Sequence, residues 1–249
     1  MFDVERKGDI EILRMQYGPA NAMDLNFCFE LTKKIQQLAE SSSGAMVLTG
    51  QGKIFSAGVD LPQLLEGGVE YVHLFLYALD EMLKTLFFCP KPVVAAVNGH
   101  AIAGGCLMAC GADRRLMVAG KARIGVPELR VGVPFPTVVL EIMRARTGSP
   151  FFEEVVLGGA TYVALDALNK GLIDGIVEPE QLLTEAITVA ESLAAIRPEL
   201  YALSKQQARQ PTREAIDSRT GLDEAEIVAL WESAETRAAV QAFVDRTLK

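Results

Sequence analysis

Histidine is scarce in this sequence, which narrows the kinds of catalysis that the protein can support. The 249 residues include two histidines, His73 and His100, and a Ser-His-Asp hydrolase would have to use one of them. The sequence also has no G-x-S-x-G, H-E-x-x-H, phosphate-loop or dinucleotide-binding motif. These absences argue against serine hydrolases, zinc peptidases and the common nucleotide-binding enzymes. Carboxylates and backbone N–H groups remain as candidate catalytic groups.

Long apolar runs and patterned cysteines are also missing. No uncharged apolar stretch reaches the roughly 18 residues that a transmembrane helix needs. The N-terminal residues 1–15 are charged and alternating, unlike a signal peptide. The four cysteines have neither disulfide-framework nor metal-site spacing, and Cys106 and Cys110 are expected to be small buried thiols. We therefore expect a cytoplasmic protein that binds neither a membrane nor a metal ion.

The charge balance is acidic. The formal net charge is −8, half of the residues are hydrophobic and 22% are charged, which is a globular composition. No basic stripe interleaved with aromatic residues is present, so a nucleic-acid partner is not expected. A small anionic ligand remains compatible with this composition, because it needs only a few local cations.

Apolar runs alternate with amphipathic segments, which predicts an α/β fold. Residues 45–50, 93–99 and 115–120 are expected to be buried strands, and residues 9–15 a half-exposed strand. The segments "QGKIFSAGVDL" and "VPELRVGVPFP" are expected to be loops. Another strand is expected in "LIDGIVE".

Helices are expected between these strands. Asp24 is placed to cap a helix over residues 25–40, and Asp60 to cap a short helix that precedes a longer one over residues 71–88. From about Ala195 the chain becomes helical and charged, which indicates a C-terminal helical region.

Two adjacent glycines, Gly104 and Gly105, stand where a helix begins in "HAIAGGCLMAC". Glycine costs roughly 1 kcal/mol against alanine inside a helix. A bare backbone at a helix N-terminus, with its unpaired N–H groups and positive dipole end, is suited to bind an anion or an oxyanion. Tight packing of the helix is the alternative explanation, and the sequence leaves both open.

Glu128 is the carboxylate in the most distinctive setting, G-V-P-E-L. Apolar neighbours could desolvate it and raise its pKa towards neutrality, as a general acid or base requires. A solvated loop glutamate is the alternative.

Three segments in this order, "FSAGVDL", "NGHAIAGGCLMACGADRRL" and "IGVPELRVGVPFP", resemble the crotonase superfamily of enoyl-CoA hydratases and isomerases. The resemblance implies a spiral of β-β-α units over residues 1–195 and a helical oligomerisation region over residues 196–249. It also implies an acyl-CoA thioester as substrate, no separate cofactor because the substrate carries coenzyme A, and a homotrimer or homohexamer.

The resemblance further assigns roles to residues. The backbone N–H groups of Val59 and Gly104 would hold the thioester oxygen as it becomes an oxyanion, and Glu128 would be the catalytic carboxylate. The loop residues Ala57, Gly58, Asp60 and Leu61 would wrap the adenine of CoA. Lys53 would meet a CoA phosphate.

One departure from the family pattern bears on the reaction. Hydratases of the family carry a second glutamate after the helix motif, and Leu107 occupies that position here. Leucine cannot hold a water, whereas a double-bond isomerase needs none, and the stretch A-G-G-C-L followed by one glutamate resembles the Δ3,Δ2-enoyl-CoA isomerases. A hydratase with an unusual second acid, Glu141 or Asp113, is an alternative. A non-catalytic acyl-CoA-binding protein is another.

Overall fold

A computed structural model describes residues 2–219 and 224–247 of the chain, and its largest sheet has six strands in the order β1-β2-β4-β7-β9-β12. These strands are β1 (Phe2–Lys7), β2 (Ile10–Met15), β4 (Ala45–Thr49), β7 (Val93–Val97), β9 (Arg114–Val118) and β12 (Gly175–Val177). β1 pairs antiparallel with β2, and the other neighbours are parallel. All residues of β4 and β7 are buried, as expected of parallel strands covered on both faces.

A smaller sheet lies beside the first and makes the fold a spiral. Its order is β11-β10-β8-β5, from β11 (Thr161–Val163), β10 (Arg123–Gly125), β8 (His100–Ile102) and β5 (Ile54–Ser56). A two-stranded sheet pairs β3 (Ala22–Met23) with β6 (Gly58–Val59). The chain repeatedly places one strand in the large sheet, the next in the small sheet, and then a helix: β4-β5-α2, β7-β8-α3 and β9-β10-α4. The predicted α/β spiral of β-β-α units is therefore confirmed.

The first two helices follow the sequence closely. α1 (Leu25–Glu40) begins where predicted, and the carboxylate of Asp24 accepts a hydrogen bond of 2.7 Å from the Phe27 N–H. α2 (Leu61–Phe87) is capped by Asp60 and is broken at Gly68, where φ is 69°. The predicted short and long helices thus join into one kinked element.

The sequence-based assignment differs from the structure in several segments. Residues 2–7 form β1. β2 is almost entirely buried rather than half-exposed, because Ile10 and Ile12 pack into one core cluster and Leu13 and Met15 into the other. The two expected loops contain β5 and β6, and the short helix α4 (Glu128–Val131). β5, β6 and α4 have two to four residues each, too few for a periodicity to show.

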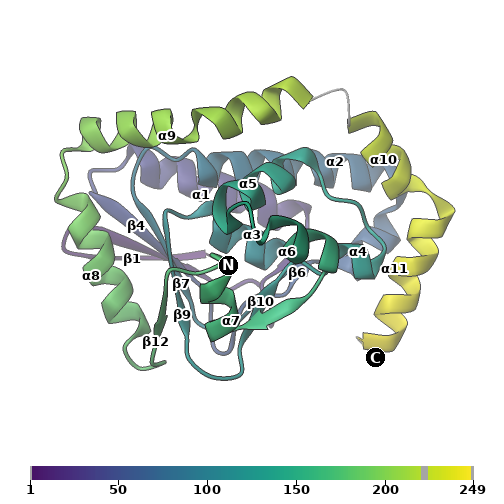
Figure 1. The fold of residues 1–249 in the computed structure, drawn as a ribbon, viewed down its shortest axis with the longest axis horizontal. Helices are drawn as coiled ribbons and strands as arrows, with labels where there is room; N and C mark the ends of the chain where they lie inside the picture. The colour runs from purple at the N-terminus through teal and green to yellow at the C-terminus, as the bar shows by residue number, and fades with distance from the viewer. Residues whose placement is uncertain (1, 220–223, 248–249) are drawn as a thin grey trace.

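The remaining helices surround the sheets (Figure 1). They are α3 (Gly104–Gly111), α5 (Thr137–Thr147), α6 (Phe152–Gly158), α7 (Ala164–Asn169), α8 (Leu182–Ala194), α9 (Pro198–Arg219), α10 (Glu224–Glu232) and α11 (Ala234–Thr247). α8 packs its buried residues against the large sheet, and α9 runs along one edge of the molecule. Among the described helices, none has the length and apolar character to cross a bilayer.

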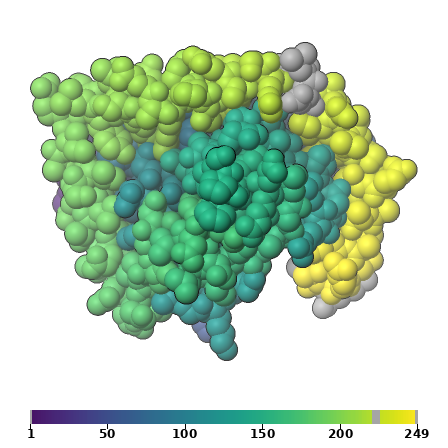
Figure 2. Space-filling view, in the orientation of Figure 1, coloured from purple at the N-terminus to yellow at the C-terminus, as the bar shows by residue number. Residues whose placement is uncertain are grey.

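The C-terminal helices α10 and α11 cover one flank of the core (Figure 2). Trp231 and Val240 are buried in the main core cluster, and Ile227 and Phe243 pack against it. Leu200, Leu203 and Leu230 are about half exposed; Leu222 lies outside the described residues. Part of the apolar content of the C-terminal region is therefore covered by the chain's own core.

Candidate active site

One pocket brings the predicted catalytic segments together. It holds about 650 Å³ of open space between β6, α3, α4, α5 and the C-terminal helices. Three of its residues are the predicted catalytic groups Val59, Gly104 and Glu128. The other lining residues are Ala57, Leu61, Leu79, Ile102, Ala103, Leu107, Pro127, Val131, Val133, Pro134, Phe135, Pro136, Val139, Trp231 and Phe243.

The Val59 backbone is positioned by its neighbours in the chain. Asp60 N–H donates to Met23 O at 2.9 Å, and Gly58 N–H donates to the Ser56 hydroxyl at 3.1 Å. Gly58 has φ of 86°, and a Cβ there would lie 2.7 Å from Ile102 O and 3.1 Å from Gly104 N. A glycine is therefore required at position 58 for both its conformation and its close approach to the start of α3.

The start of α3 answers the question raised by its two glycines. A Cβ on Gly105 would collide with the carbonyl oxygen of Ser56, and one on Gly104 would lie 2.6 Å from Met23 Sδ. Both glycines are thus explained by tight packing. The first bond of the helix is Leu107 N–H to Ala103 O, which leaves the N–H groups of Gly104 and Gly105 without an acceptor inside α3. The two glycines therefore allow close packing at the start of α3, where two backbone N–H groups have no acceptor within the helix.

Ala103, which precedes α3, has a strained backbone. Its φ of 51° and ψ of −123° are unusual for a residue with a Cβ, and its N–H is held by Gly125 O at 2.8 Å. Such conformations cost about 1–3 kcal/mol and persist only where the surroundings enforce them. The strain occurs at the turn that precedes α3, where both Ala103 and Gly104 line the pocket.

Glu128 is the first residue of α4, and Pro127 precedes it at the cap. Its backbone carbonyl accepts hydrogen bonds from the N–H groups of Gly132 and Val133 at 3.0 and 3.1 Å, which fixes the turn. The residue as a whole is partly exposed, but its Oε2 is buried and has no hydrogen-bond partner among the described residues. Burial raises the pKa of Glu128 to about 8. The alternative of a solvated loop glutamate is therefore wrong.

The wall around Glu128 is apolar. Leu107 is 2% exposed and lines the pocket. It occupies the sequence position at which hydratases of the family carry their second glutamate. Of the described residues that line the pocket, Glu128 alone has an ionisable side chain. Asp113 instead pairs with Lys205 and Arg209, and Glu141 lies near two arginines, outside the pocket. Neither can supply the second acid.

Comparison with known proteins agrees with this geometry. The family model for enoyl-CoA hydratases and isomerases matches residues 5–248. The chain belongs to the enoyl-CoA hydratase/isomerase family.

Relatives of both activities are found. A putative enoyl-CoA hydratase from Thermus thermophilus is 33% identical over 190 residues, covering 75% of this chain and 74% of that protein. The mitochondrial enoyl-CoA delta isomerase 1 of Rattus norvegicus is 27% identical over 214 residues, covering 84% and 74%. The crystal structure of human mitochondrial delta3-delta2-enoyl-CoA isomerase superimposes with a TM-score of 0.94 at 24% identity, covering 98% of this chain and 97% of that one. The chain is thus an enzyme of this family with the crotonase fold.

The predicted CoA-binding residues of this enoyl-CoA hydratase/isomerase lie partly in the pocket lining and partly outside it. Ala57 and Leu61 line the pocket. Gly58 and Asp60 shape the backbone and cap α2, and Lys53 is exposed outside the lining. Their contact with CoA stays a prediction. His100 lies on the surface, where its Nδ1 accepts a bond of 3.3 Å from Arg123 N–H, a structural arrangement.

Several lining residues were not anticipated. Trp231 and Phe243 come from the C-terminal helices, and Phe135 and Val139 from the segment after α4. No local sequence pattern predicts that these residues line the pocket. Trp231 and Phe243 reach it because the C-terminal helices α10 and α11 pack against α2.

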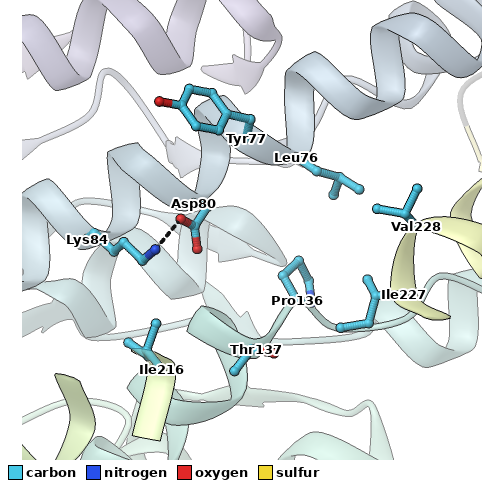
Figure 3. Close-up of a pocket in the computed structure, with 9 residues that line it drawn as sticks. All are labelled: Leu76, Tyr77, Asp80, Lys84, Pro136, Thr137, Ile216, Ile227 and Val228. Carbon is cyan, nitrogen blue, oxygen red and sulfur yellow. Dashed lines mark ion pairs between the residues drawn. The ribbon is translucent and has the colours of Figure 1, made fainter. Parts of the chain in front are cut away.

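A second groove adjoins the pocket and shares Pro136 with it (Figure 3). It holds about 560 Å³ between α2, α5, α9 and α10. Leu76, Ile227 and Val228 face it, and the Asp80–Lys84 ion pair of 2.6 Å lies on another part of its wall. The apolar surface of the active site therefore continues beyond Pro136.

Proposed function

We propose that this enzyme is a Δ3,Δ2-enoyl-CoA isomerase in which Glu128 carries the proton. The observation that supports this most directly is the apolar environment of Glu128, with buried Leu107 in the same pocket. A hydratase must hold and activate a water, and hydratases of the family use two carboxylates to do so. An isomerase only moves a proton between two carbons of the substrate.

The first half of the reaction removes a proton. The Glu128 carboxylate takes a proton from C2 of the 3-enoyl thioester, and the C–H electron pair enters the conjugated system as a dienolate. Negative charge then develops on the thioester oxygen. The N–H groups of Val59 and Gly104 are proposed to stabilise that charge, each contributing about 3 kcal/mol in the transition state.

The second half returns the same proton. Protonated Glu128 donates it to C4, and the remaining double bond lies between C2 and C3. A pKa of about 8 suits this exchange, since a group that both accepts and returns a proton works best near the operating pH. No separate cofactor is part of this proposal, because the substrate itself carries coenzyme A.

The alternative is hydration of 2-enoyl-CoA, which is favoured by the hydratase names among the relatives. We propose a cytoplasmic location on the sequence features alone; some relatives are mitochondrial proteins.

Parallel assays separate the two activities. Turnover of 3-hexenoyl-CoA and crotonyl-CoA is measured side by side, with migration of deuterium from C2 to C4 of a C2-deuterated 3-hexenoyl-CoA as the readout of proton transfer. We expect fast isomerisation and slow hydration. Hydration as efficient as isomerisation would replace the isomerase proposal by the hydratase.

A further inference from the structure

Another cleft, separate from the active site and from the groove beside it, lies at the opposite end of α3. It holds about 680 Å³ and shares no described lining residue with the active-site pocket. α3 begins at Gly104 in the active site and ends at Gly111, and Asp113, two residues further on, lines this cleft. The other lining residues are Arg114, Arg146, Leu193, Tyr201, Ser204, Lys205, Ala208 and Arg209.

The cleft carries a surplus of positive charge. Its described lining has four cations and one carboxylate, Asp113, which both Lys205 (2.6 Å) and Arg209 (2.5 Å) share. The adjacent Arg115 pairs with Asp174 at 2.8 Å and adds no net charge. The local charge is therefore +3 (four cations less one carboxylate), in a chain whose formal net charge is −8.

Arg146 is the least compensated of these cations. Its Nε and Nη2 donate to Cys110 O and Ala112 O at 2.7 and 2.8 Å, where the negative end of the α3 dipole offsets part of its charge. No carboxylate forms an ion pair with it in the described part of the chain. Burial, and then repulsion by Arg209 and Arg115, lowers the pKa of Arg146 to about 9. Because a guanidinium stays charged in proteins, this surplus favours a bound anion.

An unsatisfied donor points the same way. Arg209 is 7% exposed, and its Nη1 is buried without a hydrogen-bond partner among the described residues. A buried N–H donor of a charged group that lacks an acceptor destabilises the folded state, and native structures rarely leave such a donor without a partner.

We propose that this cleft is a binding site for a phosphate-type oxyanion. Guanidinium groups present paired N–H donors that match phosphate oxygens, and the cleft contains more than one. Lys205 adds a point charge, and Tyr201 and Ser204 add hydroxyl-bearing side chains to the lining. The apolar Leu193 and Ala208 complete the lining.

Binding is tested on the full-length protein with inorganic phosphate as the probe. Titration calorimetry gives the affinity, and thermal denaturation is followed as phosphate replaces chloride at constant ionic strength. We expect saturable binding and a rise in melting temperature, because a ligand that binds only the folded state stabilises it. Equal stabilisation by acetate at the same ionic strength, or no effect of phosphate beyond that of chloride, would overturn the proposal.

Variants locate the site. Arg209→Gln should weaken phosphate binding by about tenfold or more, the effect of losing a charged hydrogen bond. Arg114→Gln serves if that variant does not fold, because the Arg114 side chain is 52% exposed, and it should weaken binding several-fold. Arg197→Gln, at a side chain that is 75% exposed and outside the cleft, is the matched control and should bind as the wild type does. Unchanged binding in Arg114→Gln and Arg209→Gln would show that phosphate binds elsewhere.

Discussion

Glu128 illustrates how position rather than residue type creates a catalytic group. The chain has 32 acidic residues, and among those that the structure describes Glu128 is the one placed in the apolar pocket with a buried, unpartnered oxygen. The sequence identified it through its setting beside Pro127, and the raised pKa agrees with that interpretation. Two consequences for pH dependence follow from the same burial.

The first concerns activity. A general base must be ionised, so we expect kcat/KM for 3-hexenoyl-CoA to rise with pH and to level off above about 8, the pKa of Glu128. Glu128→Gln should keep acyl-CoA affinity and lose about 100- to 10,000-fold in turnover. Steady-state kinetics across the pH range, with acyl-CoA binding by calorimetry, checks both. Near-full activity of the Gln variant would remove Glu128 from the mechanism.

The second concerns stability. The pKa of Glu128 is about 8 when folded and takes its ordinary value, 4.5, when unfolded. Between these values the folded state binds more protons than the unfolded state, so this residue lowers the free energy of unfolding as pH rises. Glu128→Gln should therefore be no more stable than wild type below about pH 4.5 and increasingly more stable up to about pH 8. Urea denaturation at several pH values measures this difference.

A surface glutamate provides the control for that experiment. Glu199, whose side chain is 76% exposed, should give no such pH-dependent gain on replacement by glutamine. An equal gain in both variants would mean that a change in net charge, rather than burial of Glu128, is responsible.

At the scale of elements, α3 carries the choice between the two proposed reactions. Leu107→Glu would add a carboxylate near Glu128, and we expect a weak gain in hydration of crotonyl-CoA, since no neighbouring residue is arranged to orient a water. The variant should also be less stable, because a buried carboxylate is desolvated. Leu107→Gln, similar in size but unable to transfer a proton, should show no gain. Hydration assays on both variants decide the point.

The helix α10 contributes to the pocket as well as to stability. Trp231 is 6% exposed and lines the active site, so Trp231→Ala should raise KM for the acyl substrate and lower the free energy of unfolding by about 3 kcal/mol. The neighbouring Leu230 is 47% exposed, and Leu230→Ala should change stability by less than about 0.5 kcal/mol. Equal effects of the two substitutions would contradict the packing described for α10.

The elements differ in how well the sequence predicts them. α1 was placed to the residue, since its cap at Asp24 and its apolar stripe are encoded locally. β5, β6 and β8 depend on pairing with one another and with β3 and β10, which lie far apart in the chain. The catalytic backbone positions came from resemblance to a family. The Trp231 and Phe243 wall, like the strain at Ala103, could not be foreseen because tertiary packing imposes it.

At the scale of the whole molecule, an exposed apolar stripe supports the proposed trimer or hexamer. Leu200 and Leu203 are 51% and 54% exposed, and their spacing of three places them on one side of the start of α9; Ile196, which is 43% exposed, lies two residues before this helix. Such a contiguous stripe is typical of an interaction surface. We expect a trimer or a dimer of trimers at micromolar concentration.

Sedimentation velocity tests the assembly. Leu203→Glu should shift the protein towards the monomer, because the new charge would be buried in the interface. Leu165→Glu, at a 62% exposed residue of α7, is the comparison and should not. A wild-type protein that sediments as a monomer would contradict the assignment of this surface.

The division of labour between backbone and side chains also bears on how such an enzyme changes during evolution. The proposed oxyanion donors are main-chain groups at Val59 and Gly104, so a mutation of the Val59 side chain leaves its donor in place. Gly58, by contrast, tolerates no substitution without moving both donor segments. A new reaction therefore requires exchange of side chains such as Leu107 or Glu128 within an unchanged thioester cradle. One or two side-chain substitutions can therefore change the reaction, whereas a single substitution at Gly58 would disrupt binding of the thioester oxygen.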